Sequence, residues 1–441
     1  MSRHKRKPPL DPVSTRIESL THEGRGVTHI DGKTVFVDGV LPGEEVLFKY
    51  TRQNRRYDEG EVVEIITPSA HRVEPKCSHF AICGGCSLQH LAPAQQIISK
   101  QQVLLDNLQR IGKVSPAEVM PPLTGPIWGY RRKARLGVKY VFKKEKVLVG
   151  FREKRSGLLA QLEHCEVLHQ SVGADLTRLA DLVRSLSCYD KIPQIEVAVS
   201  DEHTALVFRH LVELTAEDKQ RLIDYAQAHG LCLYLQAAGP DSITPLWPTA
   251  PQLRYRLDDY DVEIGFEPSD FVQVNREINQ KMIKLALDLL ELQADDKVLE
   301  LFCGIGNFSL ALAKQVQQLT AVEGDKGLVE RARKNAALNN ISNAEFHVAD
   351  LMSVDPQTSW LRQDYSKVLL DPARSGADGI LPQLAKLAVP RMVYVSCNPA
   401  TLARDAGILC HEYGYRLVKV GVMDMFPHTA HVESIALFER D

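Results

Sequence analysis

Three cysteines with the spacing of metal ligands lie in the segment CSHFAICGGC, at Cys77, Cys83 and Cys86. Thiolates on one short loop can bind a single metal centre, and the glycines between Cys83 and Cys86 let the backbone turn tightly. Zinc sites usually contain paired Cys-x2–4-Cys motifs, and only one close pair is present here, which favours an iron–sulfur cluster over zinc. A fourth ligand must come from elsewhere, and Cys165, in the polar setting EHCEV, is the nearest candidate.

A glycine-rich segment, LFCGIGNF (301–308), follows the apolar run VLEL. Such a turn between a strand and a helix lets a ligand approach the backbone at the carboxyl end of the strand. Glu323 follows Gly306 by 17 residues, where an acid can bind a pair of ribose hydroxyls, and Asp350 and Asp371 end the next two expected strands. One G-x-G without a phosphate-binding lysine favours a nucleoside-type cofactor, S-adenosylmethionine before NAD.

A possible nucleophile, Cys397, lies in the segment VSCNP at the end of a fifth apolar strand. Cysteine is often only a small core residue. Here it lies at the edge expected to bind the cofactor, which favours a nucleophile. Cys303 is the competing candidate, but it lies inside the cofactor loop, where packing is the better interpretation.

Residues 131–155 form a strongly basic strip. They contain eleven Lys or Arg and two acids, a net +9 in a chain whose net charge is −3. Aromatic side chains lie among these charges, at Tyr130, Tyr140, Phe142 and Phe151. Cations attract phosphates and aromatic faces stack on bases, so the strip predicts RNA contacts, first from Arg131, Arg132 and Lys133. A solvated pair of strands is the alternative.

The elements that must position these groups alternate between strand and helix in the last third of the chain. Asn275 is suited to cap a helix whose apolar residues recur at helical spacing. Expected strands follow at 298–302, 319–322, 345–348, 367–370 and 392–396, with helices from about 307 and 327. Alternating βα units predict a parallel, doubly wound sheet, followed here by two strands at 416–422 and 432–438.

The first 70 residues predict a small β-barrel of the OB type, with strands at 34–37, 45–50 and 61–66 separated by glycine turns. Such barrels often bind nucleic acid, and a purely structural barrel is the alternative. The middle of the chain predicts a mixed α+β region, with one helix at 93–112 and helical stretches near 170–186 and 215–229. The protein is therefore expected to be multidomain, with boundaries at 1–72, 73–265 and 266–441.

Composition excludes several classes of protein. With 441 residues, 44% hydrophobic and 25% charged, the chain is neither disordered nor collagen-like. No apolar run approaches the ~20 residues that a membrane helix needs. Nine cysteines, an odd count in a long chain, favour thiols or metal ligands over a disulfide framework, so a cytoplasmic location is expected.

Several segments resemble motifs of the RNA uracil-5 methyltransferases, which use S-adenosylmethionine. The strongest are DPARSG (371–376), SCNPATLARD (396–405) and HTAHVE (428–433), supported by FVQVN (271–275) and LFCGIGNF. The resemblance covers essentially the whole chain, and Val272, where an aromatic is common, is a mild variation. The amino-terminal barrel is similar to the TRAM domain of some members, and the cysteine motif is similar to their [4Fe-4S] site. TRAM domain and cluster together resemble the branch that methylates 23S ribosomal RNA, whereas the tRNA branch usually lacks the cluster cysteines.

The resemblance implies a role for each motif residue. It implies Cys397 as the nucleophile, Glu433 as the general base and a Rossmann-like catalytic domain with which residues 93–125 pack. The implied cofactor contacts are Gln273, Phe302, Asn307, Glu323, Asp350 and Asp371. The implied cluster ligands are Cys77, Cys83, Cys86 and Cys165. A monomer acting on RNA is expected; the alternatives are a tRNA uracil-5 methyltransferase and a non-catalytic iron–sulfur RNA-binding sensor.

Overall fold

The computed structural model describes residues 11–21 and 23–440, so the first ten residues of the predicted barrel segment lie outside it. The chain forms two compact units. The first contains Met1–Lys100 and Pro427–His431, and the second contains Gln101–Phe426 and Val432–Asp441. Within the described residues, no helix combines the length and the apolar character needed to span a membrane.

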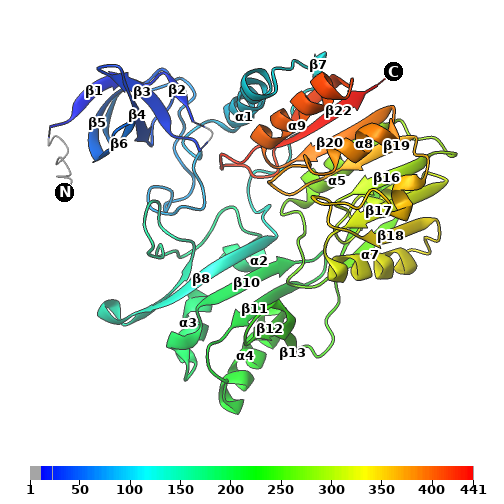
Figure 1. Ribbon diagram of the computed structural model, residues 1–441. Helices are drawn as coiled ribbons and strands as arrows, with labels where there is room; N and C mark the ends of the chain where they lie inside the picture. The colour runs from blue at the N-terminus through cyan, green and yellow to red at the C-terminus, as the bar shows by residue number, and fades with distance from the viewer. Residues whose placement is uncertain (1–10, 22, 441) are drawn as a thin grey trace, which may run out of the picture. The chain divides into compact units, whose positions relative to one another are not determined.

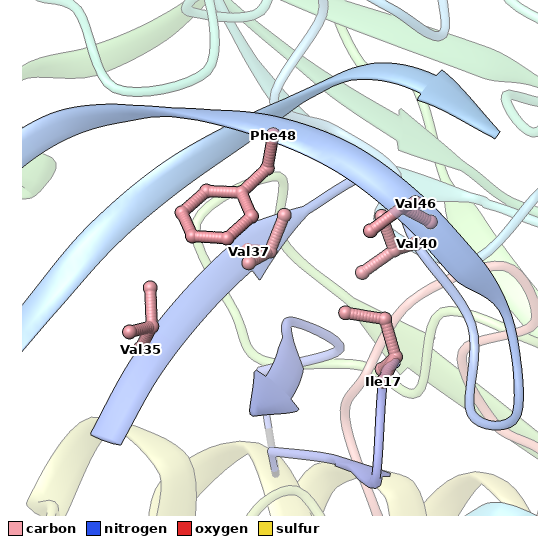
Figure 2. Packing of buried hydrophobic residues seen from close by; sticks show 6 residues of the cluster. All are labelled: Ile17, Val35, Val37, Val40, Val46 and Phe48. Carbon is pink, nitrogen blue, oxygen red and sulfur yellow. The ribbon is translucent and has the colours of Figure 1, made fainter. Parts of the chain in front are cut away.

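The amino-terminal barrel is built from one six-stranded sheet in the order β1-β5-β6-β4-β3-β2. Its strands are β1 (Val13–Arg16), β2 (Ser19–Leu20), β3 (Gly26–Ile30), β4 (Lys33–Asp38), β5 (Glu45–Gln53) and β6 (Tyr57–Thr67). Thr15 on β1 and Thr28 on β3 share a hydroxyl hydrogen bond of 2.6 Å, which joins the first strand of this order to the last but one. The core is small and aliphatic around one ring, and Figure 2 shows its members, Ile17, Val35, Val37, Val40, Val46 and Phe48.

The segment after the barrel contains the three clustered cysteines and then a helix. Residues 72–92 have no regular helix or strand apart from isolated bridges such as Arg72 with Leu91. Helix α1 (Pro93–Asn107) continues into a π-helical turn at Leu108–Gly112, so the helix predicted over 93–112 is confirmed.

A six-stranded sheet occupies the middle of the chain, in the order β13-β12-β11-β10-β8-β9. Its strands are β8 (Lys133–Val141), β9 (Lys146–Gly150), β10 (Gln194–Val199), β11 (Thr204–Arg209), β12 (Leu231–Gln236) and β13 (Ile243–Trp247). The helices of this region are α2 (Gln170–Gly173), α3 (Thr177–Ser185) and α4 (Ala216–His229), which confirms the predicted helical stretches. Thr215 and Asp218 form a capping box at the start of α4. The region is therefore α+β, as predicted.

An eight-stranded sheet, built mostly from the last third of the chain, has the order β18-β17-β16-β19-β20-β22-β21-β7. Its strands are β7 (Glu118–Val119), β16 (Lys297–Leu301), β17 (Gln318–Glu323), β18 (Ala344–Val348), β19 (Lys367–Leu370), β20 (Arg391–Ser396), β21 (Arg416–Met423) and β22 (Glu433–Glu439). The strands from β18 to β20 are parallel, whereas β22 is antiparallel to both β20 and β21. The predicted parallel sheet and its two final strands are confirmed.

Helices surround this sheet in the alternation that the sequence predicts (Figure 1). They are α5 (Arg276–Leu290), α6 (Ser309–Ala313), α7 (Lys326–Leu338), α8 (Leu381–Leu387) and α9 (Pro399–Glu412). The side chain of Asn275 accepts a hydrogen bond from the Ile278 N–H, so this residue caps α5 as expected. A separate hairpin, β14 (Leu253–Leu257) and β15 (Val262–Phe266), precedes α5 and packs against α7.

Candidate active site

The direction of winding reverses between β16 and β19, and open α/β sheets bind ligands at the carboxyl ends of the strands at such a point. The loop after β16 lies at this point. Phe302, Gly304 and Gly306 have φ angles of 65°, 56° and 96°, the left-handed region that glycine adopts readily. A Cβ atom added at Gly304 would meet no atom within 4 Å, so the backbone here faces open space. A ligand can therefore approach this backbone closely.

Glu323, which ends β17, and Asp350, which follows β18, lie at the same edge of the sheet. One carboxylate oxygen of Glu323 accepts a hydrogen bond from the Gly304 N–H at 3.1 Å, and the other accepts one from the Gly324 N–H at 2.7 Å. Asp350 is exposed, and hydrogen bonds from the Met352 N–H and the Ser353 hydroxyl lower its pKa. Glu323 is thus held in a fixed orientation beside the glycine loop.

Gln273 and Asn307 belong to one neighbourhood with two residues that the sequence motifs did not indicate. Gln273 lines a small cavity together with Tyr255 and Asn279. The Oδ1 atom of Asn307 accepts from the Tyr255 hydroxyl and from the Asn279 amide, each at 2.9 Å, and its Nδ2 atom donates to Asn279 at 2.8 Å. The Asn307 side chain therefore ties the cofactor loop to α5 and to the β14–β15 hairpin.

The predicted nucleophile and the predicted base come together through the antiparallel pairing of β20 and β22. Ser396, the last residue of β20, pairs with Ser434, and the Ser434 hydroxyl donates to the Ser396 carbonyl at 3.3 Å. Cys397 follows Ser396 and Glu433 precedes Ser434, so this register brings the two side chains to the same end of the strand pair. Glu433 is 9% exposed.

The surroundings of Cys397 oppose its ionisation. Burial, and then the negative charges of Glu433 and Asp371, raise the pKa of the Cys397 thiol to about 11, while the positive charge of Arg374 acts in the opposite direction. Burial also raises the pKa of Asp371, to about 7. At pH 7 a thiol of this pKa is ionised in only roughly one molecule in 10⁴. Cys397 is therefore a thiol in the protein alone, and Arg374 is the neighbour whose charge favours the thiolate.

Replacing the two charged neighbours is expected to change Cys397 reactivity in opposite directions. Asp371→Asn removes a charge that raises the thiol pKa, so alkylation at pH 8 should be faster; Arg374→Met should make it slower. Each change should be about two- to tenfold, since one pKa unit is a tenfold change in thiolate. The rate is measured with iodoacetamide by mass spectrometry of the Cys397 peptide. Asp378→Asn, in the adjoining loop and paired with Arg404, is the control; equal rates in all three variants would contradict the assignment.

The loop that carries Asp371 and Arg374 is held in place by side chains from the middle of α9. The buried Asp405 carboxylate accepts hydrogen bonds from the Ala377 N–H and the Tyr394 hydroxyl, both at 2.7 Å. Arg404 donates to the Ser375 carbonyl at 2.9 Å. The motifs DPARSG and SCNPATLARD therefore form one hydrogen-bonded structure around Cys397.

A further acid, Glu300, lies buried beneath the cofactor loop and was not among the predicted site residues. Burial raises its pKa to about 8, and the nearby charges of Asp371 and Glu323 act in the same direction. Cys303, the rival nucleophile, is 3% exposed, and burial raises its pKa well above the ordinary value. A thiol that is so strongly buried is suited to packing, as the sequence analysis preferred.

The predicted cluster cysteines are divided between the two units. Cys77, Cys83 and Cys86 lie in the first unit and Cys165 in the second. Cys86 is buried, the other three are half-buried, and the Gly85 N–H donates to the Cys83 sulfur at 3.4 Å. Across residues 11–21 and 23–440, no group of three or more His, Cys, Asp or Glu side chains has the geometry of a metal-ion site. An iron–sulfur centre therefore stays a prediction.

The three cations predicted to contact RNA have partners inside the protein. Arg132 forms an ion pair with Asp201 at 2.7 Å, and Arg131 donates to the Lys133 carbonyl and lies over the ring of Phe151. Lys133 donates to the Pro268 carbonyl, and burial lowers its pKa to about 8. Part of their positive charge therefore forms contacts inside the protein, and these contacts hold the start of β8 in place.

Comparisons with known proteins agree with this geometry. The sequence profile of the tRNA (Uracil-5-)-methyltransferase family matches residues 252–441, and that of the TRAM domain matches residues 15–63. A protein from Nitrosococcus oceani named 23S rRNA (uracil(1939)-C(5))-methyltransferase RlmD is 54% identical, over 100% of this chain and 99% of its own. A protein of the same name from Methylococcus capsulatus is 54% identical over 99% of each chain.

A solved structure has the same fold. It is the Pyrococcus abyssi tRNA (uracil-54, C5)-methyltransferase in complex with S-adenosyl-L-homocysteine, which covers 97% of this chain and 100% of its own with a TM-score of 0.75 and 24% sequence identity. At this identity the likeness concerns the fold alone, which it matches over both the amino-terminal barrel and the carboxyl-terminal sheet. With full-length relatives at 54% identity, the chain belongs to the RNA uracil-5 methyltransferase family.

Proposed function

We propose that this protein transfers a methyl group from S-adenosylmethionine to C5 of a uridine in 23S ribosomal RNA, the uridine at position 1939 that its relatives' names specify. The observation that carries the proposal is the juxtaposition of Cys397 and Glu433 at adjoining ends of β20 and β22, in a sheet of the methyltransferase type. A thiol and a carboxylate at one point are what this reaction requires.

The chemistry explains the need for both groups. C5 of uracil is a poor nucleophile, and addition of the Cys397 thiolate to C6 creates an enolate whose C5 can attack an electrophilic methyl group. S-adenosylmethionine supplies that methyl group on a positively charged sulfur. Glu433 then removes the remaining proton from C5, and the bond between C6 and the Cys397 sulfur breaks, which restores the uracil ring and the free cysteine.

The residues at the sheet edge fit the cofactor. The open backbone at Gly304 and the oriented carboxylate of Glu323 suit a nucleoside, whose ribose hydroxyls Glu323 would bind. Gln273, Phe302, Asp350 and Asp371 complete the binding set. Asn307 is included for its position in the glycine-rich loop, since its side chain is engaged with Tyr255 and Asn279.

The cysteines fit an iron–sulfur centre by the chemistry of their donor set. Three sulfurs come from one loop of ten residues, and the N–H of Gly85 points at the Cys83 sulfur, a hydrogen bond that stabilises a thiolate ligand. We infer that Cys77, Cys83, Cys86 and Cys165 would hold a [4Fe-4S] cluster. Such a cluster would crosslink chain segments that are far apart in the sequence.

The RNA-binding surface includes the tip of the β8–β9 hairpin. Lys143, Lys144 and Lys146 are exposed there, and Phe142 is 72% exposed. The Phe142 ring contacts Tyr140 with centroids 4.9 Å apart, and Tyr140 contacts Tyr189 at 4.7 Å. An exposed ring supported by further rings and surrounded by lysines suits an unpaired base and its phosphates.

Replacing Lys143, Lys144 and Lys146 with Ala is expected to reduce the salt dependence of RNA binding without lowering the melting temperature. The slope of log K against log salt should fall by about 0.7 for each phosphate of single-stranded RNA that the variant no longer neutralises. Replacing Arg131, Arg132 and Lys133 should also lower the melting temperature, because these cations have internal partners. Exposed Lys284, Lys314 and Lys326 provide the control triple variant. An unchanged slope for the hairpin variant would mean that the lysines of the tip are ordinary solvated residues that do not contact RNA.

The proposed function is tested by measuring methyl transfer to 23S rRNA and to tRNA with labelled S-adenosylmethionine. Methylation of 23S rRNA alone is expected, and methylation of tRNA alone would assign the protein to the tRNA branch. Mass mapping of 23S rRNA from a strain without the gene should show the target uridine unmethylated. A protein that binds RNA but transfers no methyl group would be the non-catalytic alternative.

A further inference from the structure

Two asparagine side chains from the end of α7 bind the backbone of β15, which forms a two-stranded sheet with β14. The Asn339 Oδ1 atom accepts from the Glu263 N–H at 2.8 Å, and its Nδ2 atom donates to the Glu263 carbonyl at 2.6 Å. One turn earlier, the Asn335 Oδ1 atom accepts from the Gly265 N–H at 2.9 Å, and its Nδ2 atom donates to the Gly265 carbonyl at 3.0 Å. The two amides therefore bind β15 along one edge, as a third strand would.

Asn335 makes one further contact that Asn339 does not share. Its Nδ2 atom also donates to the carbonyl of Ile305, at 3.0 Å, in the glycine-rich loop after β16. An amide nitrogen has two protons, and the Gly265 and Ile305 carbonyls accept one each. Asn335 and Ile305 are each 3% exposed, so water does not compete for this hydrogen bond. Asn335 thus joins the loop directly to α7 and to the β14–β15 hairpin.

The loop needs such contacts because its own residues do not select one backbone conformation. Gly304 and Gly306, on either side of Ile305, have positive φ angles, and glycine adopts many conformations at similar free energy. Before Ile305, the Gly304 N–H donates to the Glu323 carboxylate. After it, the hydrogen bond from Asn335 fixes the orientation of the peptide group between Ile305 and Gly306. The loop is therefore held from both sides by side chains of other elements.

We propose that Asn335 is a positioning residue for S-adenosylmethionine, acting through the Ile305 carbonyl. It keeps the glycine-rich loop in the conformation that binds the cofactor before the cofactor arrives. Without the amide, the buried Ile305 carbonyl loses this partner, and fewer molecules have the competent loop. The apparent Kd rises in inverse proportion to that fraction. The inference rests on the proposed binding of S-adenosylmethionine at this loop.

The test measures binding of S-adenosylmethionine alone to the full chain by isothermal titration calorimetry. Asn335→Leu, which retains a side chain of similar size without the amide, should raise the Kd about tenfold. The KM for S-adenosylmethionine should rise by a similar factor, with kcat at saturating cofactor within about twofold of wild type. Amide hydrogen exchange across residues 303–308 should be faster without cofactor. Misfolded molecules lower the stoichiometry of binding and leave the Kd of the folded ones unchanged.

Asn339→Leu is the matched control, because the Asn339 side chain binds Glu263 and the Asn335 carbonyl rather than the loop. It should lower the melting temperature, as Asn335→Leu does, and retain the wild-type Kd. If Asn335→Leu does not fold, Asn335→Ala places the best helix former on α7 and gives the same comparison. An unchanged Kd in the Asn335 variants, or an equal rise in Asn339→Leu, would overturn the proposal. Wild-type protein that binds no S-adenosylmethionine would overturn the proposed function as well.

Discussion

Glu433→Gln is expected to stop the reaction after methyl transfer, with the RNA still bonded to Cys397. Breaking the bond between C6 and sulfur requires removal of the C5 proton, and a neutral amide is a very poor base. General base catalysis is typically worth 10²–10⁴-fold, so release should slow by about that factor while addition and methylation continue. The complex should survive denaturing electrophoresis and contain the transferred methyl group. Slow proton loss to water can erode it, so early time points are required.

Cys397→Ala is expected to block the first step of the reaction, the addition of the thiolate to C6. The variant should still bind RNA and cofactor, because Cys397 contributes only one small side chain to the site. It should form no covalent complex. Glu439→Gln is the matched control, since Glu439 ends the strand that Glu433 begins and pairs with Arg391 at 3.2 Å. Normal turnover by Glu433→Gln would remove Glu433 from the mechanism. A persistent complex in Cys397→Ala would move the nucleophile elsewhere, with Cys303 the next candidate.

The catalytic sheet is predictable from the sequence because its central strands are buried on both faces. β16, β19 and β20 are four to six residues long and mostly apolar, and such segments separated by helical periodicity specify βα units. The barrel is less predictable. Its first three strands contain two to five residues with alternating polar positions, as in β1, and they lack the continuous apolar signal. These segments adopt strand conformation because they form hydrogen bonds with strands that come later in the chain.

In the candidate site, too, residues in local sequence motifs could be predicted, whereas residues brought in by long-range contacts could not. Cys397 and Glu323 were predicted because each lies at the end of an apolar strand, and Glu433 because HTAHVE (428–433) resembles a motif of the family. Tyr255 was not, because its relation to the cofactor loop is a hydrogen bond with Asn307, 52 residues later in the chain. Charge counting likewise located the basic strip but could not distinguish Lys133, which is half-buried with an internal partner, from the exposed Lys143.

Protein purified without oxygen is expected to be brown and to contain about four irons and as much sulfide per chain. The sulfur donors come from Cys77, Cys83 and Cys86 on one loop, and only one of their spacings is the close pair typical of zinc. Exposure to air should bleach the absorbance as the cluster breaks down. Colourless protein with one zinc per chain would contradict the prediction of an iron–sulfur cluster. The cysteines would then be the ligands of a zinc site.

The fourth ligand is decided by comparing single cysteine variants. Cys83→Ser removes a sulfur that accepts the Gly85 N–H, and it should lose nearly all iron, because serine is a poor ligand for iron in such clusters. Cys165→Ser should lose iron to the same extent if Cys165 completes the site. Cys410→Ser, a half-buried cysteine on α9, should retain the full iron content and serves as the control. A Cys165→Ser protein with full iron and sulfide would exclude Cys165, and the same measurement on Cys188, Cys232 and Cys303 would then identify the residue that takes its place.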